Sequence, residues 1–134
     1  MICYRVVRRK FAGLSGEGAR RYGGRFNPPG VSAIYSSQSI ALALLEVLVH
    51  VDKSEVPNDY FVMAIQIEGR SVYRPRNVDL LRTSYNRPVI RLPSVIVPRE
   101  YNYVLFPEAE GFEASIAWTE PLNFDSRLFA FAGE

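Results

Sequence analysis

Apolar residues occur along this chain in short runs that are separated by glycine, proline and charged residues. Runs rich in β-branched and aromatic residues are typical of strands, and they predict strands over residues 2–7, 31–35, 60–67, 94–97, 102–106 and 128–131. Residues 111–118 fit a strand or a short helix equally well. Residues 70–93 contain three prolines and are predicted to be irregular, with one or two helical turns over 78–82.

One segment, residues 36–51, predicts a helix. It contains an unbroken apolar stretch, and Ser37 or Ser39 can serve as its N-cap. The pattern is apolar nearly all round, so we expect this helix to be buried on most of its faces. Together with the strands, the helix indicates an α+β fold with more strand than helix.

The 134 residues predict a single domain over 1–134, and 48% apolar with 22% charged residues is an ordinary globular composition. No run of 18 apolar residues is present, so no membrane span is expected. The first ten residues are basic and lack the apolar core of a secretory signal. Cys3 is the only cysteine, so no internal disulfide can form, and we expect a cytoplasmic protein.

Charge is distributed unevenly, although the net charge is only +2. Residues 1–25 hold seven basic residues and one acidic residue, whereas the remainder holds nine basic and thirteen acidic residues. A local basic end on a nearly neutral chain favours an anionic ligand over a long nucleic-acid footprint. A solvated basic edge without a ligand is the alternative.

Glu46 interrupts the apolar helix, where a carboxylate is unfavourable unless it is paired, neutralised or turned towards a polar cleft. Two interpretations carry equal weight at this point. Glu46 is either a functional carboxylate in a cleft, or it lies on an exposed stripe or pairs with an arginine. His50 follows one helical turn later on the same face, and we interpret it as a packed or helix-end histidine.

The glycine-rich stretch over residues 12–30 has no clear periodicity and is long for a simple connection, which is typical of a binding loop. Within it, Gly23 and Gly24 precede Arg25. Consecutive glycines let a ligand approach the backbone, and an adjacent arginine can bind phosphate or carboxylate. A plain turn is the alternative. The sequence contains neither a Rossmann fingerprint nor a P-loop.

Two further polar residues carry weaker signals. Ser94, at the start of a predicted strand, is either a cap or a hydroxyl donor at the edge of a cleft. Tyr35, at the end of another, is either a core residue or a stacking platform for a flat ring. One histidine and one cysteine are too few soft ligands for a zinc site, so we expect no metal.

Several motifs together resemble the RES-domain family, named for Arg, Glu and Ser, over most of the chain. The first is Leu-Ser-Gly-Glu-Gly-Ala over 14–19, followed by Gly-Gly-Arg-Phe-Asn over 23–27 and by Gly30. The second is Ile-Tyr-Ser-Ser over 34–37, followed by the helix segment 41–50 that contains Glu46. The carriers in the second half are Leu-Pro-Ser-Val-Ile-Val-Pro over 92–98, Asn102-Tyr103 and Phe-Asp-Ser-Arg-Leu over 124–128.

This resemblance implies a compact domain similar to the ADP-ribosyltransferase toxin fold, with short strands around an NAD cleft and one main buried helix. It also implies the toxin of a type II toxin–antitoxin system, which cleaves the nicotinamide–ribose bond of NAD by hydrolysis or phosphorolysis. Its expected partner is an Xre-type helix-turn-helix antitoxin that blocks the cleft. NAD is the substrate, and neither a metal, a membrane nor direct nucleic-acid binding is expected.

The same resemblance suggests roles for individual residues. Glu46 would stabilise the positive charge that develops on the ribose, and Arg5 and Arg25 would bind the pyrophosphate. Tyr35 would stack on the nicotinamide ring. In addition, Ser94 would donate a hydrogen bond near the ribose or the nicotinamide, and Asn27 would help to shape the loop.

Two departures from the family pattern lie in the second half of the chain. The stretch between Ile67 and Pro93 is shorter than expected, and residues 106–110 read Phe-Pro-Glu-Ala-Glu where Asn-Pro-x-His-Pro is usual. These departures could shift the acceptor from water or phosphate to a protein, so mono-ADP-ribosylation of a metabolic protein is the first alternative. A single-stranded nucleic-acid binding module, suggested by the basic end and the many aromatic residues, is the second.

Overall fold

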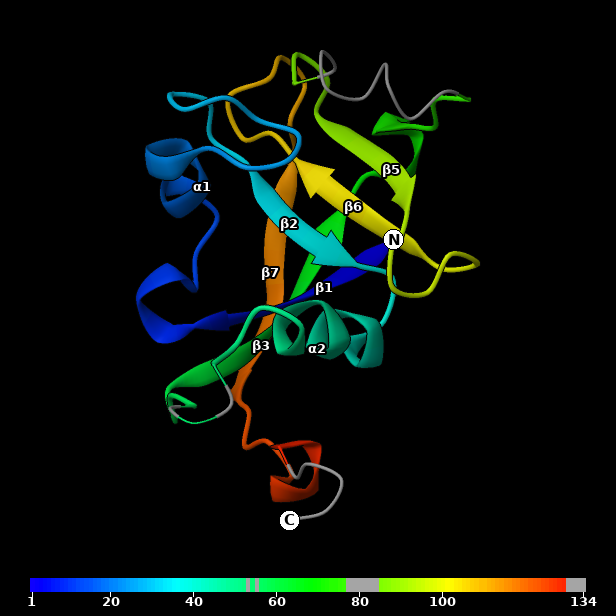
Figure 1. Cartoon of the computed structure of the whole chain (residues 1–134). Helices are drawn as coiled ribbons and strands as arrows, with labels where there is room; N and C mark the ends of the chain where they lie inside the picture. The colour runs from blue at the N-terminus through cyan, green and yellow to red at the C-terminus, as the bar shows by residue number, and fades with distance from the viewer. Residues whose placement is uncertain (53, 55, 77–84, 130–134) are drawn as a thin grey trace.

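A mixed sheet of seven strands forms the body of the computed structural model, which describes residues 1–52, 54, 56–76 and 85–129 (Figure 1). The order across the sheet is β4-β5-β6-β2-β1-β3-β7, and all neighbours are antiparallel except β4 and β5. The strands are β1 (Ile2–Arg8), β2 (Ile34–Ser37), β3 (Tyr60–Ile67), β4 (Val72–Tyr73), β5 (Val89–Pro93), β6 (Tyr101–Leu105) and β7 (Ala114–Pro121). Two α-helices accompany this sheet in the described residues, which confirms the α+β class.

The apolar runs located β1, β3 and β6 correctly, and within the ambiguous segment 111–118 the residues from Ala114 onward belong to β7. The strand predicted over 94–97 is wrong, because the Ser94 hydroxyl accepts hydrogen bonds from two backbone N–H groups there and holds the chain in a turn. The strand predicted over 128–131 is also wrong where it can be compared, since Ser126–Phe129 is a 3₁₀ helix, and residues 130 and 131 lie outside the described residues.

Residues 70–93 are not irregular throughout, because β4 and β5 lie at the two ends of this range and pair in parallel. The prolines did not prevent this pairing, since Pro75 follows β4 and Pro88 precedes β5. The helical turns predicted over 78–82 lie outside the described residues.

The predicted helix is α2 (Ile40–Leu48), which is shorter than the range 36–51 because residues 34–37 belong to β2. Its N-cap is Ser39, whose side chain accepts a hydrogen bond from the backbone N–H of Leu42 at 3.1 Å. The helix packs against β1 and β2, and its fully buried residues are Leu42, Ala43 and Leu48. Leu45 is exposed on the remaining face, so the helix is mostly but not wholly covered.

The glycine-rich stretch contains a helix that the sequence pattern did not predict, α1 (Glu17–Tyr22). Its N-cap is Gly16, with φ of 65°, and a Cβ at this position would lie 2.7 Å from the backbone nitrogen of Ala33. Glycine is therefore required where this loop passes the backbone that leads into β2. In Figure 1, α1 lies at one side of the sheet, well separated from α2.

The two central strands β1 and β2 are joined at one residue pair, Tyr4 opposite Ser37, although both lie wholly within the described residues. β2 continues along β6 and β1 continues along β3, so the sheet opens between them. A buried cluster packs on one face and includes Cys3, Val7, Ile34, Met63, Ile65 and Leu105. No helix in the described part of the chain is long and apolar enough to span a membrane.

Candidate functional site

A cavity of about 640 Å³ lies where β1 and β2 separate, and its size is that of a small-ligand site. Its walls come from four strands (β1, β2, β5 and β6), from α2 and from the loop that follows α1. Four of the six predicted site residues line it together, namely Arg5, Arg25, Tyr35 and Glu46. The other two, Asn27 and Ser94, are buried behind the lining.

Glu46 of α2 is partly buried, and its Oε1 accepts hydrogen bonds from Ser94 Oγ at 2.7 Å and from Asn102 Nδ2 at 2.7 Å. Both donors are neutral, and within the described ranges no cationic side chain forms an ion pair with Glu46. Such donors stabilise a carboxylate without cancelling its charge. Among the described residues Glu46 is therefore not paired with an arginine, and its side chain is half-buried at the cavity wall.

Ser94 is buried directly behind Glu46, at the start of the turn that follows β5. Its hydroxyl oxygen accepts hydrogen bonds from the backbone N–H groups of Ile96 at 3.1 Å and Val97 at 3.0 Å. The hydroxyl proton is directed to Glu46. Ser94 thus contacts the carboxylate, whereas its direct contact with NAD stays a prediction.

Arg5 of β1 lies in the opening between the two strands, where its guanidinium donates to the backbone carbonyl of Tyr35 at 3.3 Å. Its Nε is buried and has no hydrogen-bond partner among the described residues. Burial lowers the pKa of the Arg5 guanidinium to about 10, because the charged form loses hydration without gaining an anion. The cationic group is therefore incompletely satisfied at the wall of the cavity.

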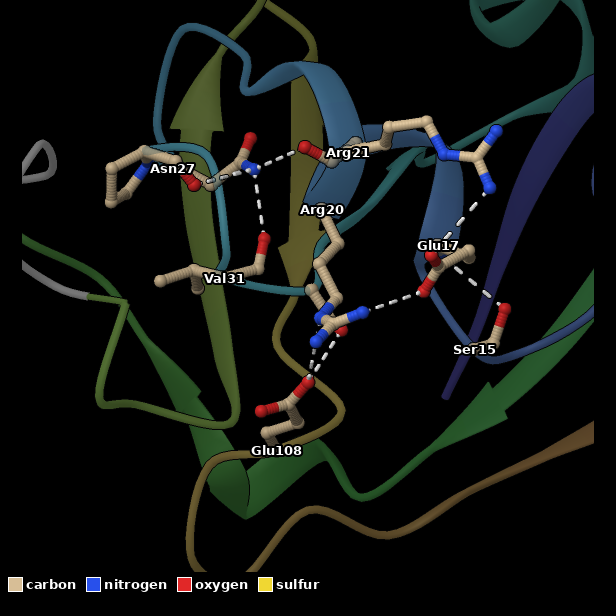
Figure 2. A network of polar contacts seen from close by, with 10 residues as sticks. Ser15, Glu17, Arg20, Arg21, Asn27, Val31 and Glu108 are labelled. Carbon is tan, nitrogen blue, oxygen red and sulfur yellow. Dashed lines mark hydrogen bonds and ion pairs between the residues drawn. The ribbon is translucent and has the colours of Figure 1, made fainter.

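Asn27 holds the loop after α1 in shape, as predicted. Its Nδ2 donates to the backbone carbonyls of Ala19 and Val31, each at 2.9 Å, and Figure 2 shows the amide reaching towards Val31. Its Oδ1 accepts the Tyr35 hydroxyl at 2.6 Å, and the same hydroxyl oxygen accepts from the backbone N–H of Phe26. Burial raises the pKa of Tyr35, which keeps this hydroxyl protonated as a donor.

Gly24 serves the packing of the protein itself. A Cβ on Gly24 would lie 2.5 Å from the Tyr35 hydroxyl oxygen and 2.7 Å from Asn27 Oδ1. The absence of a side chain therefore makes room for the Tyr35–Asn27 hydrogen bond, and the expected approach of a ligand to this glycine stays a prediction. Arg25 follows on the exposed side of the loop, with its guanidinium 5.0 Å from the centroid of the Phe26 ring.

Sequence reasoning assigned no functional role to Asn102 and considered Ser37 only as a helix N-cap, although both belong to motifs of the resemblance. They are opposite each other in the register of β2 and β6, and the Ser37 hydroxyl donates to Asn102 Oδ1 at 2.7 Å. The signal in the sequence that could have identified them is their polar character in two segments that otherwise read as apolar strands. His50 lies beyond the end of α2 and is exposed at the cavity wall, so it is a helix-end histidine that is not packed.

The basic N-terminal region is partly neutralised by acidic side chains. Arg8 forms a bidentate pair with Asp59, and Arg20 and Arg21 both lie within ion-pair distance of Glu17 (Figure 2). A second hollow of about 440 Å³ is bordered by cationic side chains, namely Arg5, Arg9, Lys10 and Arg21. Across the described residues, no cluster of three or more His, Cys, Asp or Glu side chains is arranged to hold a metal ion.

Comparison with known proteins gives relatives over nearly the whole chain. The "Toxin Res" of Photorhabdus laumondii is 36% identical over 152 residues, covering 96% of this chain and 97% of the relative. The "Prs ADP-ribosylating toxin" of a Sphingobium species is 30% identical, covering 75% of this chain and 78% of that protein. The "NAD(+) phosphorylase MbcT" of Mycobacterium tuberculosis is 50% identical over 46 residues, covering 34% of this chain and 25% of that enzyme.

The fold also matches a solved structure. The crystal structure of the M. tuberculosis MbcT–MbcA toxin–antitoxin complex aligns with a TM-score of 0.70 and 19% identity, over 96% of this chain and 86% of that chain. The family model for the RES domain matches residues 2–88, a range that holds β1, the loop with Arg25, and α2 with Glu46. This chain therefore belongs to the RES-domain family.

Proposed function

We propose that this chain is a toxin enzyme that cleaves the nicotinamide–ribose bond of NAD. The observation that carries the proposal is Glu46, a carboxylate held by neutral donors in a cavity whose walls also hold Arg5 and Arg25. The names of its relatives support the same substrate, since they describe an ADP-ribosylating toxin and an NAD(+) phosphorylase.

The negative charge of Glu46 and the positive charges of Arg5 and Arg25 have different roles in this proposal. Cleavage of the glycosidic bond leaves an oxocarbenium-like ribose, and the bonding electron pair departs with nicotinamide, which becomes neutral. Glu46 stabilises the positive ribose, because neutral donors leave its own charge in place. Arg5 and Arg25 bind the pyrophosphate, which supplies the anion that the guanidinium of Arg5 lacks.

The remaining residues orient the substrate. The Tyr35 ring lines the cavity, and its hydroxyl is fixed by Asn27 and by the Phe26 backbone, so the ring offers a rigid surface for the nicotinamide. Ser94 acts through Glu46 in this mechanism. No strong general acid is required at the leaving group, since nicotinamide departs as a neutral molecule.

The acceptor of the ADP-ribosyl group is water or inorganic phosphate in this proposal. Water would add a hydroxyl to C1″ of the ribose and release a proton, whereas phosphate would form ADP-ribose 1″-phosphate. Transfer to a side chain of a target protein is the second candidate, which the name of the Sphingobium relative supports. All three reactions share the bond-breaking step at Glu46.

We further propose that an antitoxin restrains the enzyme, because the similar MbcT structure is that of a toxin in complex with its antitoxin MbcA. Exposed apolar residues beside the cavity, Val49 and Val95, provide a surface that a partner segment could cover. An Xre-type helix-turn-helix partner and a cytoplasmic location are parts of this proposal that follow from the family resemblance.

The test is NAD consumption by the purified wild type, by Arg25→Ala and by Glu46→Ala, each with and without inorganic phosphate. NAD loss in the wild type that both variants lack supports the proposal, and phosphate dependence identifies the acceptor. Intact NAD together with ADP-ribosylated protein in a lysate would favour the transferase. Intact NAD together with oligonucleotide binding that falls steeply with salt would support the binding module instead.

A further inference from the structure

We propose that Asn102 and Ser37 are positioning residues that fix the carboxylate of Glu46 in one orientation, with Oε2 presented to the substrate. The inference rests on the function proposed above and deepens it. Sequence reasoning assigned neither residue a role at the site, and although both line the cavity, we place their action on Glu46 and not on NAD.

The pairing of β2 and β6 brings the two residues together. Ser37 and Asn102 occupy opposite positions in the antiparallel register, so their side chains lie on the same face of the sheet. This face is the one from which Asn102 reaches Glu46 of α2. Ser37 is buried, and its hydroxyl donates to Asn102 Oδ1 at 2.7 Å.

The contacts at its two ends fix the orientation of the Asn102 amide. An asparagine amide can be turned by half a rotation, which exchanges its oxygen and nitrogen. The carboxylate of Glu46 can only accept, so the NH₂ end faces its Oε1 at 2.7 Å, and the Ser37 hydroxyl donates to the oxygen end. The opposite orientation would place the amide oxygen against a carboxylate oxygen, with no proton between them. Ser37 therefore holds the amide in the orientation that Glu46 requires.

Ser94 supplies the second donor to the same carboxylate oxygen. Its Oγ accepts from two backbone N–H groups, which occupy both of its lone pairs, so its single proton is available for Glu46 Oε1. One donor from a strand and one from a turn thus converge on Oε1. Within the described ranges Oε2 accepts no hydrogen bond, so Oε2 is the oxygen that is free to face the ribose.

The test is a double-mutant cycle with Ser37→Ala, Asn102→Ala and the double variant, measured as kcat and KM for NAD. Hydrogen bonds to charged groups predict a loss in kcat of roughly 10- to 100-fold for Asn102→Ala, and a neutral bond predicts about 3- to 10-fold for Ser37→Ala. We expect KM to change less than about threefold. In the Asn102→Ala background, Ser37→Ala should cause no further loss, because its target is gone.

Ser32→Ala is the matched control, since Ser32 is a buried serine outside the cavity lining whose hydroxyl also donates to a carboxylate at 2.7 Å. It should leave kcat and KM unchanged. If Asn102→Ala does not fold, Asn102→Leu replaces it, because leucine keeps a similar shape without hydrogen-bonding groups. Multiplicative losses in the double variant, or a Ser37→Ala effect confined to KM, would overturn the proposal.

A second readout needs no NAD turnover, so it separates this inference from the proposed function. Crystal structures of the wild type and Ser37→Ala should show Glu46 in one orientation in the former and in more than one in the latter. If Glu46 moves in the variant while the wild type consumes no NAD, the positioning holds and the assigned reaction fails. If Glu46 keeps its place in Ser37→Ala, the positioning proposal fails whatever the activity.

Discussion

Two carboxylates of this protein each accept a serine hydroxyl at 2.7 Å, but their other neighbours differ. Glu46, at the wall of the cavity, accepts hydrogen bonds from Ser94 and Asn102, and both donors are neutral. Glu108 receives Ser32 and lies 3.9 Å from the Arg20 guanidinium, with 66% of its own side chain exposed (Figure 2). The same type of hydrogen bond therefore holds a carboxylate without an ion-pair partner at the cavity, and it belongs to an exposed ion-pair contact at Glu108.

One departure from the family pattern lies in the second of these regions. Glu108 belongs to the segment 106–110 that replaces Asn-Pro-x-His-Pro, and its partners Ser32 and Arg20 flank the loop that carries Arg25. Glu108 is not among the residues that line the cavity. The changed segment thus contributes Glu108 to a contact outside the cavity. That it shifts the acceptor of the ADP-ribosyl group to a protein stays a prediction.

The largest difference is expected when each carboxylate loses its charge. Glu46→Gln should abolish growth inhibition in a bacterial host, because about 100-fold or more of the cleavage rate depends on the carboxylate. Glu108→Gln should remain as toxic as the wild type. Colony counts after induction, with protein levels matched by immunoblot, provide the measurement. Equal toxicity of the two variants would contradict the claim that Glu46, and not Glu108, is needed for the cleavage.

A smaller difference is expected for the two serines. Ser94→Ala should lower kcat for NAD by roughly 10- to 100-fold, because Glu46 loses a donor and the turn loses its cap. Ser32→Ala should leave kcat unchanged and lower the free energy of unfolding by about 1 kcal/mol. Steady-state kinetics and urea unfolding check both. A Ser94→Ala enzyme with wild-type kcat would contradict the role given to Ser94.

The loop between the two regions can be disturbed without altering either carboxylate. Gly24→Ala should lower the free energy of unfolding by about 1–3 kcal/mol, since the methyl group would displace the Tyr35 hydroxyl from Asn27. KM for NAD should rise, because Arg25 follows in the same loop. Gly13→Ala is the matched control, since nothing lies within 4 Å of a Cβ at that position. Equal stability of the two variants would count against this account of Gly24.

The smallest expected effect concerns Arg5. Burial lowers the pKa of its guanidinium to about 10, so folding disfavours the charged form at every pH below that value. Arg5→Met should therefore stabilise the NAD-free protein by about 1 kcal/mol while it weakens NAD binding. The gain should be constant from about pH 6 to 9 and should shrink as the pH rises through about 10. Urea unfolding across this pH range measures the change. If Arg5 already had its full set of hydrogen-bond partners, Arg5→Met would lower the free energy of unfolding instead of raising it.

The sequence predicted those features that depend on local pattern or on a family motif. The strands β1 and β3 follow from runs of β-branched and aromatic residues, and Glu46 was identified because a carboxylate is unusual in an apolar helix. It did not predict α1, since glycines obscure its periodicity and its start depends on the distant backbone of Ala33. The donors to Glu46 could not be deduced either, because the register of β2 and β6 brings Asn102 there.

Cleavage of the nicotinamide–ribose bond depends above all on the Glu46 carboxylate in the mechanism proposed for this enzyme. The most direct measurement is the rate of nicotinamide release from NAD by the purified wild type, by Glu46→Gln and by Glu108→Gln, followed by chromatography. We predict release by the wild type and Glu108→Gln at similar rates, with a rate for Glu46→Gln that is at least about 100-fold lower. Nicotinamide release by Glu46→Gln at the wild-type rate would contradict this mechanism.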